Sequence, residues 1–249
     1  MVKLPAAARV PVATLAWPRA SRLIPARFQA LDCFERILEP GEQDLGATLI
    51  RLAELTTPWG TRDLTLMDPA QVIFGPGAGW IMASYAAPRP GRFSTARRGA
   101  CYVAEEIETG LAEVRHHLQE SYRREGVTEV LDLEYRALTV HLQGSLHDIR
   151  GKARARAPWS AIYDPGAYAA SQAFAGQLLA AGAQGLAYDS VRRPGGACAA
   201  LFDPNLLRAC RHDTYLVLRW DGAAVTRVLE QRILALSPRT RTPTGDGPR

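Results

Sequence analysis

Four polar residues stand in apolar or glycine-rich surroundings and are the candidates for chemistry in this sequence. Arg92 lies in Gly-Arg-Phe-Ser, Tyr102 in a short apolar run, Glu113 in an amphipathic stretch, and Ser190 where an apolar run ends. A guanidinium offers a fork of donors that suits an anion, and a carboxylate can transfer protons or stabilise positive charge. Each also has a plain structural interpretation: a surface charge, a core aromatic, a solvated carboxylate and a turn residue, respectively.

The spacing of apolar residues predicts the strand and the helix that carry Tyr102 and Glu113. Residues 100–104 form a short apolar run that predicts a strand containing Tyr102. Apolar residues then recur at helical spacing, which predicts a helix over residues 106–122 with one face formed by Ile107, Leu111, Val114 and Leu118. At about 100° per residue, Glu113 lies roughly 120° from the centre of that stripe. It is therefore at the flank of the helix, where either solvent or a cleft can meet it.

The remaining segments mix helices and short strands. Alternation that changes phase at Ala137 predicts a bulge, or a break between two strands, within residues 131–142. A glycine-rich turn at 75–79 precedes an apolar run at 80–87 that fits either a helix or a strand. Further elements are predicted as helices over 42–55 and 165–181, strands at 186–190 and 197–202 around a turn at 194–196, and a final hairpin of 215–219 and 224–229 around Asp221-Gly222. Because regular βαβ alternation is missing, the class is α+β.

Length and charge favour one domain that does not bind nucleic acid. The chain has 249 residues and a formal net charge of +5. Residues 1–30 carry +5 and residues 237–249 carry +2, so the residues between them sum to −2. A basic excess at the two ends is not the basic face that a nucleic-acid binder needs. We expect a flexible N-terminal segment at 1–20, one compact domain at 21–236 and a disordered tail at 237–249.

The sequence lacks the motifs that are typical of several classes of active site. The motifs of dinucleotide folds, P-loop enzymes, nucleophile-elbow hydrolases and zincins are all missing from the sequence. The adjacent His116 and His117 point about 100° apart on a helix, so they do not suit one metal ion, and no metal site is predicted. Four widely spaced cysteines predict small core residues in a reducing compartment, namely Cys33, Cys101, Cys198 and Cys210. With neither a clear signal peptide nor a membrane span, we expect the cytoplasm.

The sequence resembles the RES-domain toxins, a family named for an arginine, a glutamate and a serine. The arginine, tyrosine and glutamate follow one another at gaps of ten and eleven residues. The resemblance runs through Arg22-Leu-Ile-Pro-Ala-Arg-Phe28, Arg92-Phe-Ser94, Ala100-Cys-Tyr-Val-Ala104, Leu111-Ala-Glu-Val114, His117 and Gly185-Leu-Ala-Tyr-Asp-Ser-Val-Arg192, with Gly195-Gly196 after it. It covers about four fifths of the chain and looks like the longer branch of the family.

The resemblance implies a fold, an activity and a partner. The fold would be a single ADP-ribosyltransferase-like domain with small split β-sheets and surrounding helices. The activity would be that of the toxin of a bacterial toxin–antitoxin pair, which consumes NAD as its substrate by hydrolysis or phosphorolysis, or transfers ADP-ribose to a protein, and arrests growth. The partner would be an antitoxin that has a helix-turn-helix part and covers the active site of the toxin.

The resemblance also assigns roles to the four candidates. Glu113 would stabilise the positive charge that develops on the ribose anomeric carbon, or deprotonate the acceptor. Arg92 would hold the pyrophosphate or its hydroxyls, Tyr102 would stack on the nicotinamide, and Ser190 would fix the ribose or the carboxamide. His117 can orient Glu113 or simply pack, and Arg192 can add a phosphate contact or lie on the surface.

Three alternatives stay open at this point. The acceptor of the ADP-ribosyl group is water, phosphate or a protein side chain, and the spacing of the motifs does not distinguish them. A protein of another class, an inert module that acts only by binding a partner, would release no nicotinamide from NAD. Direct nucleic-acid binding would show affinity that falls steeply with salt, and the charge distribution argues against it.

Overall fold

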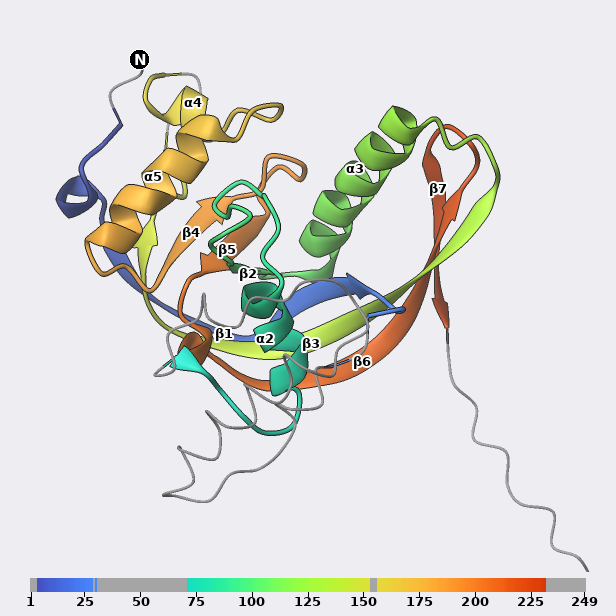
Figure 1. Ribbon diagram of the computed structural model, residues 1–249, viewed down its shortest axis with the longest axis horizontal. Helices are drawn as coiled ribbons and strands as arrows, with labels where there is room; N and C mark the ends of the chain where they lie inside the picture. Colours follow the sequence, from blue (N-terminus) through green and yellow to red (C-terminus); the bar gives the residue numbers. More distant parts are fainter. Residues whose placement is uncertain (1–3, 29, 31–70, 153–155, 232–249) are drawn as a thin grey trace, which may run out of the picture.

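The computed structural model describes residues 4–28, 30, 71–152 and 156–231 (Figure 1). Helices and strands alternate irregularly along them. In chain order the elements are η1 (Ala7–Arg9), β1 (Val12–Pro25), α2 (Ala78–Ala86), β2 (Cys101–Ala104), α3 (Ile107–Glu125), β3 (Leu131–Asp148), α4 (Trp159–Ile162), α5 (Ala169–Ala180), β4 (Gly185–Asp189), β5 (Ala197–Leu201), η5 (Pro204–Leu206), β6 (Leu207–Trp220) and β7 (Val225–Gln231).

The strands form one sheet that consists of two groups. The order is β1-β2-β5-β4-β3-β6-β7, and β1 also pairs with β3. The short strands β2, β5 and β4 form one group, and the long strands β1, β3, β6 and β7 form the other. Within the described residues the groups are joined by one register pair between β1 and β2 and two between β3 and β4. The α+β class is confirmed, and the expected small split sheets appear as these two groups, joined by short registers.

Each helix packs on its own part of the sheet through a separate hydrophobic cluster. α2 packs on β1 and β3, where Met82 and Trp17 belong to one cluster. α4 and α5 cover the short strands, where Phe174 and Leu186 belong to a second. α3 packs on the hairpin end of β6, around Trp220. In Figure 1 the loop between β4 and β5 lies between α5 and α3, so elements far apart in sequence meet there.

Strand β1 differs from the expectation of a flexible segment at residues 1–20. Val12–Pro25 is a strand that runs antiparallel to β3 over most of its length. Leu15, Trp17 and Ala20 are buried, and the pairing with β3 shifts register between Trp17 and Ala20, next to Pro18. A proline fits a strand at such an irregularity. The prolines interrupt the alternation in the sequence, and the prediction for residues 12–20 was therefore wrong.

The packing of β1 predicts a large stability effect for one residue of this segment. Trp17 is buried at 6% exposure, so Trp17→Ala should lower the free energy of unfolding by about 3–5 kcal/mol. Val12, in the same strand, is 59% exposed, and Val12→Ala should change it by no more than about 0.5 kcal/mol. Urea denaturation of both variants measures the difference. Equal midpoints would show that this segment is not packed on the sheet.

Most of the elements read from the sequence are confirmed, with ends that move by up to eight residues, the largest shift being the start of β6. In the pairing of β3 with β6, the register shifts between Ala137 and Leu138, where the bulge was predicted. The apolar run after the glycine-rich turn, which fitted either a helix or a strand, is α2. Cys101, Cys198 and Cys210 are buried, as expected for small core residues. The helix predicted at 42–55, the tail from 237 and Cys33 fall outside the described residues.

Candidate active site

Glu113 projects from the flank of α3 toward the loop that follows β4. The opposite side of α3 packs on β6 through Leu111 and Leu118, and Gly126 ends the helix in the left-handed conformation. The Glu113 side chain is 21% exposed, and its Oε1 accepts a hydrogen bond from the Ser190 hydroxyl at 2.6 Å. The carboxylate is thus held at a fixed point that solvent still reaches.

Ser190 is the centre of the loop after β4. Ser190 is fully buried. Its Oγ accepts hydrogen bonds from the backbone N–H groups of Arg192 and Arg193, both at 3.0 Å. The same hydroxyl donates its proton to Glu113. The backbone N–H of Ser190 donates to the carbonyl of Gly196, which closes the loop. Ser190 is therefore both the turn residue of the plain interpretation and a direct partner of the candidate carboxylate.

Arg92 is a buried arginine with structural partners of its own. The residue is 7% exposed, so the interpretation as a surface loop charge is wrong. Its Nη1 donates to the carbonyls of Ile162 at 3.0 Å and Asp164 at 2.8 Å, and its guanidinium lies 5.0 Å from the ring centroid of Tyr168. Among the described residues the hydrogen bonds that Arg92 donates come from Nη1.

Tyr102 fixes the loop that carries Arg92. Its hydroxyl donates to Ser94 Oγ at 3.1 Å and accepts the backbone N–H of Phe93 at 2.8 Å. A Cβ at Gly91 would lie 2.8 Å from Ser94 Oγ, so the loop passes close to these groups. Burial raises the pKa of Tyr102, while the hydrogen bonds with Ser94 and Phe93 act in the opposite direction. This tyrosine positions Arg92, and stacking of its ring on a ligand stays a prediction.

The charges of Glu113 and Arg92 both act on the pKa values of two buried groups, Tyr188 and Cys198. Burial raises the pKa of Cys198 to about 12, with Glu113 adding to the rise and Arg92 opposing it. The pKa of Tyr188 is raised well above its ordinary value by burial, and again Glu113 raises it while Arg92 lowers it. In the structure Arg92 and the loop after β4 are linked through residues 162–165, whose carbonyls accept hydrogen bonds from both Arg92 and Arg192.

His117 and Arg192 lie at the rim of this site. His117 Nε2 is 3.9 Å from Glu113 Oε2, one turn along α3. Burial and then the positive charges of Arg192 and Arg92 lower the pKa of His117, so the imidazole is neutral near pH 7 and the contact is not an ion pair. Arg192 Nη2 donates to the carbonyl of Pro165 at 2.6 Å. Arg192 thus ties the loop after β4 to the segment that also binds Arg92.

That segment, residues 162–168, is a part of the site that sequence reasoning missed. It accepts hydrogen bonds from Arg92 and Arg192 through three carbonyls, and it supplies the Tyr168 ring. Asp164 Oδ1 accepts the N–H groups of Gly166 and Ala167, which fixes the turn. The Asp-Pro-Gly sequence is a turn signal that could have drawn attention to it. Nothing in that signal points to Arg92, which lies 70 residues away.

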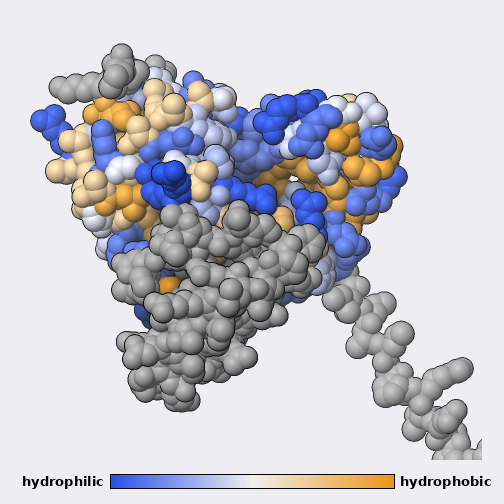
Figure 2. All heavy atoms as spheres, viewed as in Figure 1, coloured by the Kyte–Doolittle hydropathy of each residue, from blue (hydrophilic) through white to orange (hydrophobic). Residues whose placement is uncertain are grey.

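In Figure 2 the surface is hollowed between the part that carries α4 and α5 and the part that carries α3 and β7, and hydrophilic residues border the hollow.

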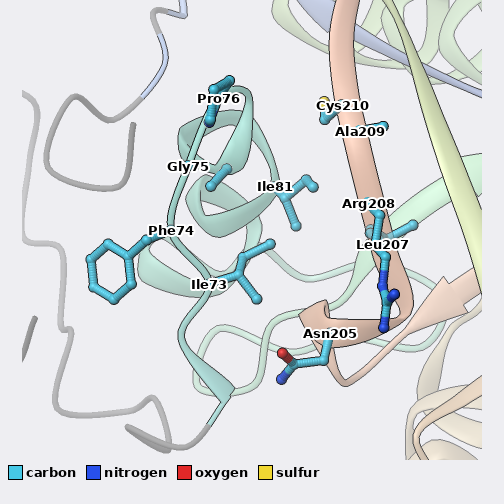
Figure 3. A pocket seen from close by; sticks show the side chains of 11 residues that line it. Ile73, Phe74, Gly75, Pro76, Ile81, Asn205, Leu207, Arg208, Ala209 and Cys210 are labelled. Carbon is cyan, nitrogen blue, oxygen red and sulfur yellow. The ribbon is translucent and has the colours of Figure 1, made fainter. Parts of the chain in front are cut away.

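A separate cavity of about 460 Å³ lies elsewhere, between residues 73–81 and 205–210, with Ile81 on one wall and Leu207 on the other (Figure 3). Neither Glu113 nor Arg92 lines it. The site built around the predicted residues is therefore not this cavity.

The described residues contain neither a metal-binding cluster nor a membrane-spanning helix. No group of three or more His, Cys, Asp or Glu side chains there is arranged to hold a metal ion. None of the helices in that part of the chain is long and apolar enough to cross a membrane.

Comparison with known proteins identifies the family. The model of the RES domain matches residues 70–221, more than half of the chain. The chain belongs to the RES domain family. The matched part of this RES domain contains Arg92, Tyr102, Glu113 and Ser190, so the resemblance read from those motifs is confirmed. The match begins after the opening stretch at residues 22–28, of which residues 22–25 form the end of β1.

Two other comparisons were made with this RES domain. Among curated proteins nothing matched it. Among solved structures it is similar to a chain of the crystal structure of the M. tuberculosis MbcT–MbcA toxin–antitoxin complex. The identity is 14%, the TM-score is 0.43, and the similarity covers 80% of this chain and 86% of that one.

Proposed function

We propose that this RES domain is the toxin of a toxin–antitoxin pair, and that it cleaves the nicotinamide–ribose bond of NAD and so arrests growth. The observation that carries the proposal is the 2.6 Å hydrogen bond between Ser190 and Glu113. The buried Arg92 is linked to the same loop, because Arg92 and Arg192 bind the neighbouring carbonyls of Asp164 and Pro165. A carboxylate, a hydroxyl and a guanidinium in one site match the charges of this reaction, and the family match covers all three residues.

The chemistry assigned to Glu113 follows from the charges of the reaction. When the bond between the anomeric carbon and the nicotinamide nitrogen breaks, its electron pair leaves with the nicotinamide, which becomes neutral. Positive charge then develops on the ribose, and a fixed carboxylate stabilises it. An incoming water or phosphate oxygen forms the new bond to the anomeric carbon, and in hydrolysis Glu113 takes up the proton that the water loses.

Ser190, Arg92 and Tyr102 would bind the substrate. Nε and Nη2 of Arg92 would donate to the pyrophosphate or to nearby hydroxyls, since Nη1 is engaged with loop carbonyls. Ser190 orients the carboxylate by its hydrogen bond and can bind the ribose or the carboxamide. Tyr102 supplies a ring against which nicotinamide stacks. No metal takes part in this proposal.

The partner in this proposal is an antitoxin with a helix-turn-helix part, which covers the active site and prevents NAD from entering. The pair would act in the cytoplasm, where NAD is available. A short helix-turn-helix protein encoded beside this chain would support the pairing. Co-expression should then restore growth, and failure of every such neighbour to do so would contradict it.

The test is to incubate the purified protein with NAD and measure free nicotinamide by liquid chromatography. We expect nicotinamide to appear in proportion to enzyme and time. Mass spectrometry of the second product identifies the acceptor: ADP-ribose for water, its 1″-phosphate for phosphate, or a modified protein for ADP-ribosyl transfer. If neither the pure protein nor the protein with cell extract releases nicotinamide, the chain is an inert binding module and the proposal is wrong.

A further inference from the structure

The loop from Ser190 to Gly196 contacts α3 at two successive turns. The later contact is the hydrogen bond from Ser190 to Glu113. In the earlier one, Arg193 Nη1 donates to Thr109 Oγ1 at 3.0 Å and to Glu106 Oε2 at 2.5 Å. Residues four apart in a helix lie on the same face, so Thr109 and Glu113 present one line of the helix to the loop.

The contact at Thr109 is tightly packed. Thr109 is fully buried, and a Cβ at Gly196 would lie 2.6 Å from its Oγ1 and 2.8 Å from its Cγ2. The loop therefore has little room to slide along the helix while Arg193 holds its place. A displacement at Thr109 would also move Ser190, because the backbone N–H of Arg193 donates to Ser190 Oγ.

The ion pair of Arg193 with Glu106 adds little to stability. The two side chains are 35% and 57% exposed, and such pairs are screened by solvent. What the pair does fix is the position of the loop relative to the start of α3. We propose that Arg193 is a positioning residue, which sets the distance between Ser190 and Glu113 through Thr109. This inference rests on the proposed function, because it assigns Arg193 to the same site.

The decisive variant is Arg193→Ala, measured by nicotinamide release from NAD. We expect kcat to fall about tenfold with KM nearly unchanged, since Arg193 acts on the geometry of the carboxylate and not on substrate binding. Thr109→Val, which keeps the shape of the buried side chain and removes the acceptor, should give a similar loss if Arg193→Ala does not fold. The matched control is Arg219→Ala, which removes an exposed ion pair with Asp132 far from the site and should leave kcat unchanged.

A double-mutant cycle separates positioning from a general structural role. In a Ser190→Ala background, Arg193→Ala should cause no further loss of kcat, because the hydrogen bond that it positions is already gone. The inference would be overturned if the loss of kcat in the double variant equalled the product of the two single losses. It would also be overturned if the Arg193→Ala protein had the kcat of the wild type.

A second readout does not depend on NAD. The carboxyl ¹³C chemical shift of Glu113 at pH 7, in protein labelled at glutamate, should change in Arg193→Ala and stay constant in Arg219→Ala. If the wild type releases no nicotinamide but this shift changes as expected, the proposed function fails and the positioning role stands. If nicotinamide is released and the shift does not move, the positioning role fails alone.

Discussion

Glu113→Gln is expected to reduce nicotinamide release from NAD by about three orders of magnitude while the fold is retained. Glutamine has the shape of glutamate, and its side-chain oxygen can still accept the hydrogen bond from Ser190. It carries no negative charge, so it neither stabilises the developing positive charge nor takes up a proton. Losses of about 10²–10⁴ are typical when one such group is removed.

The design of this experiment uses a second glutamate of the same helix. Glu120 is 59% exposed and pairs with Arg123, so Glu120→Gln makes the same chemical change at a solvent-exposed position two turns further along α3. Its rate should equal that of the wild type. The same two variants should differ in cells: Glu113→Gln should relieve growth arrest, and Glu120→Gln should not. A Glu113→Gln protein that folds and keeps its rate within threefold would exclude Glu113 as the catalytic carboxylate.

Elements with strong local periodicity could be predicted from the sequence. The four-three-four spacing of apolar residues in α3 and the change of phase at Ala137 in β3 both arise from short-range geometry, and the structure confirms both. The prediction for strand β1 was wrong for the opposite reason. Its partner, β3, begins more than 100 residues later, and prolines interrupt its alternation, so pairing with β3 outweighs its weak local pattern.

The candidate site could be predicted from the sequence only in part. Residue types and flanks pointed to Arg92, Tyr102, Glu113 and Ser190 one by one, and the structure brings Ser190 into contact with Glu113. The contacts that hold these residues in place could not be predicted from the sequence. Tyr168 meets Arg92 across 76 positions of sequence, and Arg193 meets Glu106 across 87. Such contacts depend on how α5, α3 and the loop after β4 come together, which no local pattern records.

The position of Arg92 predicts a second large effect, in which binding and stability can be separated. Arg92→Ala would leave the carbonyls of Ile162 and Asp164 without their donor, so it should both destabilise the fold and weaken NAD binding. Arg92→Lys is the sharper variant. Lysine keeps the charge and can satisfy one or both carbonyls from its single nitrogen. It has no Nε and Nη2 to offer a ligand at the same time.

For Arg92→Lys we therefore expect near-normal stability in urea and a loss of about 10–100-fold in kcat/KM for NAD, since a charge-assisted hydrogen bond contributes about 1.5–3 kcal/mol. The control is Arg98→Lys. Arg98 also donates to a backbone carbonyl, that of Gln172 in α5 at 3.0 Å, so it tests the effect of the substitution itself. Its kcat/KM should change less than threefold. Equal losses in the two variants would mean that Arg92 only supports the loop at Ile162 and Asp164, and that the anion-binding donors of the site lie elsewhere.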